Sequence, residues 1–129
     1  MPNRPAMRTL LVAALLALAW PARGGESIRI LVQSSPLAGS QYYALPARAA
    51  EIKVGDVLEL KREPDNRHDA NAVLVLWRGE KLGYLPRREN RAVARAMDEG
   101  MTLRAFVSRL HPEQADPWKR LEVAVQAEL

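Results

Sequence analysis

A run of polar residues from Glu63 to Asn71 holds the side chains best suited to chemistry in this chain of 129 residues. It reads Glu-Pro-Asp-Asn-Arg-His-Asp-Ala-Asn and lies between two apolar segments, 57–60 and 72–77. Asn and Asp side chains accept hydrogen bonds from nearby backbone N–H groups, so a loop rich in them tends to be ordered. An ordered polar loop between rigid strands is a common place for a binding site. The loop is therefore the candidate site, although Asp69 and Asn71 could equally serve only to hold it together.

Catalytic chemistry has little support. The one catalytic alternative is a metal-dependent nuclease or phosphatase built on Asp65, His68 and Asp69. Their spacing matches no zinc pattern, and the central glycine and distal glutamate of a calcium loop are missing. The chain also has no phosphate-binding glycine loop and no hydrolase nucleophile elbow. The sequence predicts a non-enzyme with neither a metal nor a cofactor.

A second group of chemically useful residues is the arginine run Arg87, Arg88, Arg91 and Arg95. Spacings of three and four place these residues on one flank of a predicted helix. One interpretation is a patch that tracks phosphates at a helix N-terminus, where the helix dipole also favours anions. The other is an ordinary solvated helix face, whose field Glu89 partly offsets.

Short strands surround these groups in the predicted order of elements. Period-two alternation or apolar runs indicate strands at 27–32, 41–45, 57–62, 72–77, 81–85, 101–110 and 118–127. Residues 46–52 form a short helix or a loop. Pro86 suits the first turn of a helix that runs to about Glu99 and ends at Gly100. The sequence thus predicts a mainly β domain with one or two helices, in a small, partly open barrel of the OB-like or SH3-like kind.

Several of these segments together resemble the HIRAN domain, a module of some SWI/SNF-type helicases that also occurs as small free-standing bacterial proteins. The resemblance covers roughly residues 35–110. It rests on Ala-Gly-Ser-Gln-Tyr-Tyr at 38–43, Val-Gly-Asp at 54–56, the loop from Leu60 to Val73, and Gly-Tyr-Leu-Pro at 83–86. Their order and spacing make the resemblance specific.

The resemblance implies that the domain captures the 3′ end of single-stranded DNA. The family positions that carry over are Tyr42, Asn66 and Asp69. A tyrosine ring offers a face on which a base stacks, and Asn and Asp accept a hydrogen bond from a sugar hydroxyl. Two positions depart from the family pattern: His68 stands in place of a tyrosine, and Gln41 stands where the DNA-binding helicase members carry arginine. The candidate nucleic-acid-binding residues are therefore Tyr42, Asn66, His68, Asp69, Arg87, Arg88 and Arg91.

The first 24 residues have the layout of a secretory leader. A basic head is followed by the apolar run 9–20, by Pro21 and by Ala-Arg-Gly at 22–24, a small-x-small site for a signal peptidase. The sequence predicts a signal peptide or N-terminal anchor over 1–24 and one domain over 25–129. Cleavage would make the protein periplasmic or secreted, whereas an uncleaved chain would be anchored by residues 9–20 or cytoplasmic.

The leader also bears on the identity of the partner. Three of the 19 Lys and Arg residues lie in it, so residues 25–129 carry 16 basic against 15 acidic residues, a net charge of +1. Overall charge therefore does not by itself indicate a nucleic-acid partner. The alternative to single-stranded DNA ends is an exported module that has lost DNA binding and recognises an envelope protein, peptide or glycan. Either way we expect a monomer.

Overall fold

Six antiparallel strands make up one strongly bent, open sheet in the computed structural model, which describes residues 27–129. The predicted leader lies outside the described residues, and its processing stays a prediction. The strands are β1 (Arg29–Pro36), β2 (Val57–Glu63), β3 (Ala72–Trp77), β4 (Glu80–Tyr84), β5 (Leu103–Leu110) and β6 (Leu121–Glu128). Their order across the sheet is β1-β6-β5-β2-β3-β4, so β1 and β4 form its two edges. The predicted fold class, mainly β and partly open, is confirmed.

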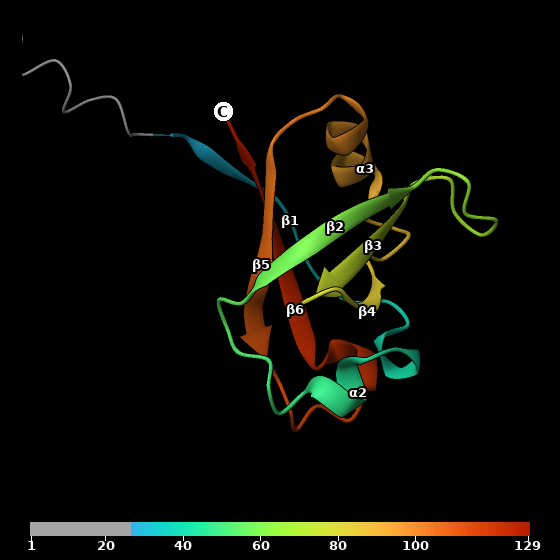
Figure 1. Ribbon diagram of the computed structural model, residues 1–129, viewed down its shortest axis with the longest axis vertical. Coiled ribbons are helices and arrows are strands. Elements are labelled where there is room, and N and C mark those ends of the chain that lie inside the picture. Colours follow the sequence, from blue (N-terminus) through green and yellow to red (C-terminus); the bar gives the residue numbers. More distant parts are fainter. Residues whose placement is uncertain (1–26) are drawn as a thin grey trace, which may run out of the picture.

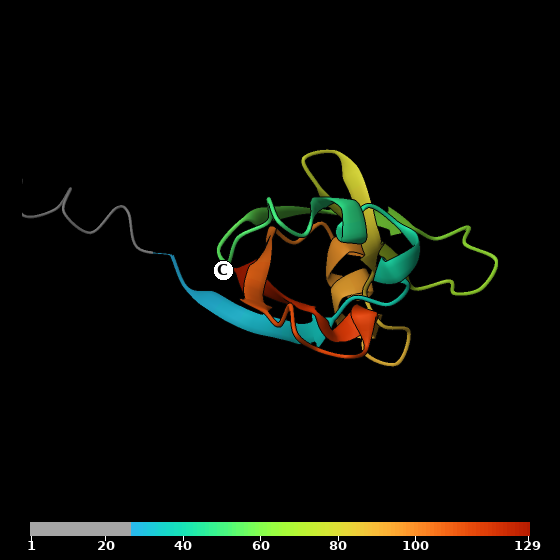
Figure 2. The same cartoon turned by 90° about the horizontal axis from the view of Figure 1, so that it is seen from below.

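The sheet bends at the pairing between β2 and β5, where only two residues of each strand are in register. Because of this bend the half formed by β1, β6 and β5 faces the half formed by β2, β3 and β4 (Figure 2). The space between the halves is filled by aliphatic side chains, among them Val73, Val75, Val107, Val123 and Val125, all of which are fully buried. The β-branched residues that favour strands therefore also form the core.

Two helices lie at opposite ends of the sheet (Figure 1). At one end is α3 (Arg91–Asp98), which buries Val93, Ala94 and Ala96. At the other end is α2 (Leu45–Arg48), which begins with Pro46 in its first turn. The side chain of Arg48 makes a two-pronged ion pair with Glu80, at 2.9 and 3.1 Å, and so ties α2 to β4. Among the described residues no helix is long and apolar enough to span a membrane.

The predicted strand at 41–45 is wrong. Gly39 adopts a left-handed conformation with φ of 72°, and the chain then forms the 3-10 helix η2 (Ser40–Tyr42) followed by α2. A five-residue apolar segment can be a strand or a helical turn, and here Gly39 and Pro46 set the local geometry. As a consequence Tyr42 is 80% exposed.

The predicted start of the last helix is also wrong. Pro86 begins a turn closed by the bond from Glu89 N to the Pro86 carbonyl, and the helix begins only at Arg91. Arg87 and Arg88 therefore lie in that turn, and they do not share a helix flank with Arg91 and Arg95. The remaining strands lie close to their predicted ranges, although Trp118 falls in the 3-10 helix η3 (Pro117–Lys119) that precedes β6.

Candidate functional site

A hollow of about 300 Å³ lies between the β2–β3 loop, β4 and the segment that leads into η2. We call it the loop pocket. The β2–β3 loop projects from the sheet (Figure 1). The residues that line it are Ala38, Gly39, Tyr43, Asn66, His68, Asp69, Ala72, Tyr84, Leu85 and Arg87.

Side-chain-to-backbone hydrogen bonds give the β2–β3 loop its shape. The side-chain carbonyl of Asn66 accepts from the N–H of His68 at 2.9 Å, and Oδ1 of Asp69 accepts from the N–H of Asn71, also at 2.9 Å. Each bond closes a local turn that imitates a backbone turn. The chain leaves the loop through a bond from Ala72 N to the Asp69 carbonyl. The predicted ordering of this loop by Asn and Asp is thus present in the structure.

Asp69 also connects the loop to helix α3. Its Oδ2 accepts a hydrogen bond from Nδ2 of Asn90 at 2.6 Å. Asn90 is the residue immediately before α3 and is 1% exposed, yet its side chain makes no capping bond to its own helix. This buried amide instead uses its donor to fix the loop against the helix. Hydrogen bonds that an ionised carboxylate accepts are typically short and strong, as this one is.

Glu63 is the centre of a second set of hydrogen bonds, which it makes with two residues that line the pocket. Its Oε1 accepts from the hydroxyl of Tyr84 at 2.8 Å and from Nδ2 of Asn66 at 3.1 Å. Burial raises the pKa of the Glu63 carboxyl, but the two hydrogen bonds, together with Lys81 and Lys61, outweigh burial and hold it below its usual value. Glu63 therefore stays ionised and keeps both Tyr84 and Asn66 in place.

Two tyrosine rings form one side of the pocket. Tyr43 and Tyr84 meet edge to face with their centroids 6.1 Å apart. The ammonium of Lys81 lies 5.2 Å from the Tyr43 centroid and 5.8 Å from that of Tyr84, within the range of cation–π attraction. Tyr43 remains 37% exposed, so part of its ring is open to a ligand.

Tyr84 provides a pH test of this arrangement. Burial first, and then the bond to Glu63, raise the pKa of the Tyr84 phenol from 10.0 to about 12. A phenol whose pKa is higher in the folded state contributes stability that is complete below its unfolded pKa of about 10 and is lost as pH rises toward 12. In a spectrophotometric titration, the difference between wild type and Tyr84→Phe should therefore show one phenol with a midpoint near 12. If the phenol that the variant lacks instead ionises near 10 in the wild type, the result would contradict the bond to Glu63.

The structure brings four of the seven candidate residues together in the loop pocket, namely Asn66, His68, Asp69 and Arg87. Tyr42, Arg88 and Arg91 do not line it. Tyr42 points to solvent because η2 replaces the expected strand, and its neighbour Tyr43 takes the place at the pocket. Arg88 and Arg91 are exposed on the turn before α3 and on its first residue.

Four residues of the site were missed from the sequence: Tyr43, Glu63, Tyr84 and Asn90. Tyr43 and Tyr84 alternate with apolar neighbours, a pattern that is typical of core residues and does not indicate a binding site. Glu63 and Tyr84 belong to the family segments, but their pattern gives no sign that they bond to each other. The one available signal for Asn90 is that asparagine is favoured immediately before the first residue of a helix.

Four arginines, in the β2–β3 loop, in the turn before α3 and at the start of α3, form no ion pair with any described residue. Within residues 27–129, no ion pair involves Arg67, Arg87, Arg88 or Arg91, whereas Arg48, Arg62 and Arg95 are each bonded to a carboxylate. Nor do the described residues contain a group of three or more His, Asp or Glu side chains that could hold a metal ion. The site can therefore offer rings, hydrogen-bond acceptors and positive charge to a ligand.

Comparison with protein families gives one match that covers most of the described chain. The model of the HIRAN domain matches residues 30–129. No curated protein matches the chain.

Two solved structures share the fold. A protein from Lactobacillus plantarum superposes with a TM-score of 0.67 at 27% identity, over 80% of this chain and 98% of that one. The HIRAN domain of human HLTF superposes with a TM-score of 0.59 at 22% identity, over 82% of this chain and 81% of that one.

Proposed function

Because the chain belongs to the HIRAN domain family, we propose that it is a non-catalytic module that binds the 3′ end of single-stranded DNA in the loop pocket. HIRAN domains are binding modules, and the family is known to bind nucleic acids. The observation that carries the proposal is the mixture of groups around one small hollow. Aromatic rings, oxygen atoms that can accept a hydrogen bond from a hydroxyl, and a guanidinium without an ion pair among the described residues all line the same hollow of about 300 Å³.

Each of these groups suits one part of a strand end. The exposed part of Tyr43 and the imidazole of His68, which lines the same hollow, suit the face of a terminal base. Stacking of this kind contributes roughly 1–3 kcal/mol per base. The guanidinium of Arg87 suits the phosphate that follows. Arg67, Arg88 and Arg91 add unpaired positive charge on neighbouring surface, where further phosphates would lie.

Asp69 supports recognition of the terminal hydroxyl. A carboxylate has about four lone-pair sites, and the bonds from Asn71 and Asn90 use two of those on Asp69. The remaining capacity is suited to a hydroxyl donor. A 3′ phosphate offers no such donor at neutral pH and brings negative charge toward the carboxylate, which is unfavourable.

The test is fluorescence anisotropy of the full chain with a 5′-labelled single-stranded decamer that ends in a 3′ hydroxyl or a 3′ phosphate. We expect the hydroxyl to bind about tenfold more tightly at low salt, the size of one charge-assisted hydrogen bond. Affinity should fall as salt rises, with a slope of roughly −2 for about three phosphate contacts. Equal affinity for the two ends would overturn end recognition.

A matched pair of arginine variants examines the phosphate contacts. Arg87→Gln should weaken binding and reduce the salt slope by roughly 0.7, because it removes one phosphate contact. Arg95→Gln is the control, since Arg95 lies on α3, pairs with Glu99 at 3.0 Å and does not line the pocket. Its salt slope should equal that of wild type.

A further inference from the structure

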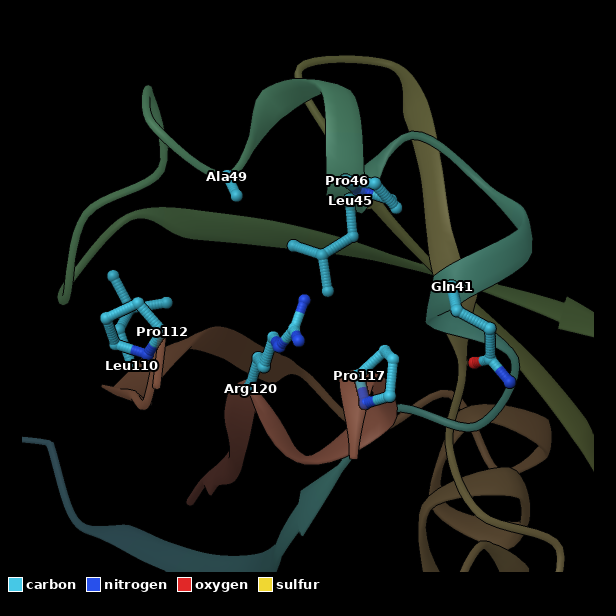
Figure 3. Close-up of a pocket in the computed structure, with 8 residues that line it drawn as sticks. All are labelled: Gln41, Leu45, Pro46, Ala49, Leu110, Pro112, Pro117 and Arg120. Carbon is cyan, nitrogen blue, oxygen red and sulfur yellow. The ribbon is translucent and has the colours of Figure 1, made fainter. Parts of the chain in front are cut away.

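A second pocket, of about 260 Å³, lies between α2 and the chain that connects β5 to β6. We call it the Arg120 pocket. Leu45, Pro46 and Ala49 form one wall, and Leu110, Pro112 and Pro117 form the opposite wall (Figure 3). It shares no lining residue with the loop pocket, although both hollows take lining residues from the short segment 38–45. Three prolines and two leucines make it the more apolar of the two.

An ion pair holds one wall in place, and backbone hydrogen bonds hold the other. The ion pair of Arg48 with Glu80 fixes the α2 wall to β4. On the opposite wall, His111 N donates to the Arg120 carbonyl at 2.7 Å, and Arg120 N donates to the Pro117 carbonyl at 3.2 Å. The hollow is thus present before any ligand binds, which lowers the entropic cost of binding.

Arg120 is exposed to solvent and lines this apolar hollow, where its side chain supplies a positive charge. Its guanidinium points from the β5–β6 wall toward Leu45 (Figure 3). Nε donates to the Gln114 carbonyl at 2.9 Å, which fixes the arm of the side chain. Within residues 27–129, no carboxylate pairs with this arginine, and no hydrogen bond uses its two terminal nitrogens. The free edge formed by the two terminal nitrogens of a planar guanidinium matches a carboxylate, which it binds through two parallel bonds.

We propose that the Arg120 pocket binds the C-terminal residue of a polypeptide partner, with an apolar side chain between the two walls and the α-carboxylate on Arg120. The volume lies below the roughly 300–1,000 Å³ of pockets for drug-sized ligands and suits one large side chain. Pro46, Ala49 and Pro112 are exposed at the pocket, and the neighbouring Trp118 is 38% exposed. The partner's residues before its C-terminal residue would cover this exposed apolar rim. Such surrounding contacts exclude water from an anchor residue in a protein interface.

The test is a titration of the ¹⁵N-labelled full chain, followed by NMR, with an acetylated hexapeptide that ends in leucine. Three other probes accompany it: the same peptide as a C-terminal amide, the same peptide ending in aspartate, and sodium octanoate. The leucine acid should shift the amide signals of Leu45, Ala49 and Leu110. The amide and the aspartate peptide should each bind about tenfold more weakly, because one lacks the carboxylate and the other lacks the apolar anchor.

Variants assign the effect to the pocket. Arg120→Gln should weaken the leucine acid about tenfold and leave the amide unaffected, and Ala49→Phe should block both by filling the hollow. Lys119→Gln is the charge-matched control, since Lys119 lies in the same segment but pairs with Asp116 at 3.2 Å. The dispersion of each variant's amide spectrum shows whether it folds. Equal affinity for acid and amide, no shift at millimolar peptide, or binding of octanoate but not of the peptide would each overturn the proposal.

Discussion

Asp69→Ala is expected to destabilise the domain by about 3 kcal/mol and to remove binding of single-stranded DNA ends. The substitution removes the acceptor for Asn71 N, which shapes the loop, and the acceptor for Asn90 Nδ2 at 2.6 Å. Asn90 is 1% exposed and its Oδ1 already has no partner among the described residues, so its whole amide would be left buried without a bond. Urea unfolding gives the loss of stability, and anisotropy at a temperature where the variant is folded gives the loss of binding.

Asp69→Asn separates the structural role of this residue from a role toward ligand. The new amide keeps an oxygen for Asn71 N, and a flip of the Asn90 amide would let its Oδ1 accept from the new nitrogen. We therefore expect a loss of stability below about 1 kcal/mol. The preference for a 3′ hydroxyl over a 3′ phosphate should nevertheless decrease, because the charged acceptor is gone. An unchanged preference for the 3′ hydroxyl in Asp69→Asn would show that Asp69 only holds the loop. A loss of stability under about 0.5 kcal/mol in Asp69→Ala would contradict the structural role as well.

The strands of the candidate site could be predicted from the sequence because their patterns are local. Ala72 to Trp77 is an apolar run that ends in a turn at Arg78 and Gly79, and β3 has those same bounds. The polar loop before β3 could also be predicted, since the bonds of Asn66 and Asp69 to the backbone reach only two residues along the chain. Patterns that act within one turn or one strand are visible without tertiary structure.

The rest of the site depends on contacts between residues that are distant in sequence. Asp69 meets Asn90, and Glu63 meets Tyr84, each pair 21 residues apart. Amide, hydroxyl and carboxylate groups leave no periodic signal that pairs one with another. The exchange of Tyr42 for Tyr43 at the pocket has a different origin, because a single misassigned segment reverses which neighbouring side chain points inward. The order of residues thus located the site, whereas tertiary contacts decided which side chains reach it.

Gly83→Ala is expected to destabilise the domain by about 2–4 kcal/mol and to weaken DNA binding through the position of Tyr43 and Tyr84. Gly83 has φ of 154°, and a Cβ there would lie 2.8 Å from the carbonyl oxygen of Ala38. That carbonyl accepts from Tyr84 N at 3.0 Å, and Ala38 N donates back to the Tyr84 carbonyl at 2.8 Å. The backbone therefore has no room to move without breaking the bridge that joins the two sides of the loop pocket. Thermal and urea unfolding measure the loss.

Gly79→Ala is the matched control for this close approach. Gly79 also has a positive φ, of 79°, but a Cβ at that position would meet nothing within 4 Å. Only the conformational penalty then applies, and we expect a loss of about 1 kcal/mol with DNA binding unchanged. The difference between the two variants isolates the contact with Ala38 from the general cost of a side chain at positive φ. Equal losses would mean that β4 and the segment before η2 can separate freely, and the Ala38–Tyr84 bridge would then not be what positions the tyrosines.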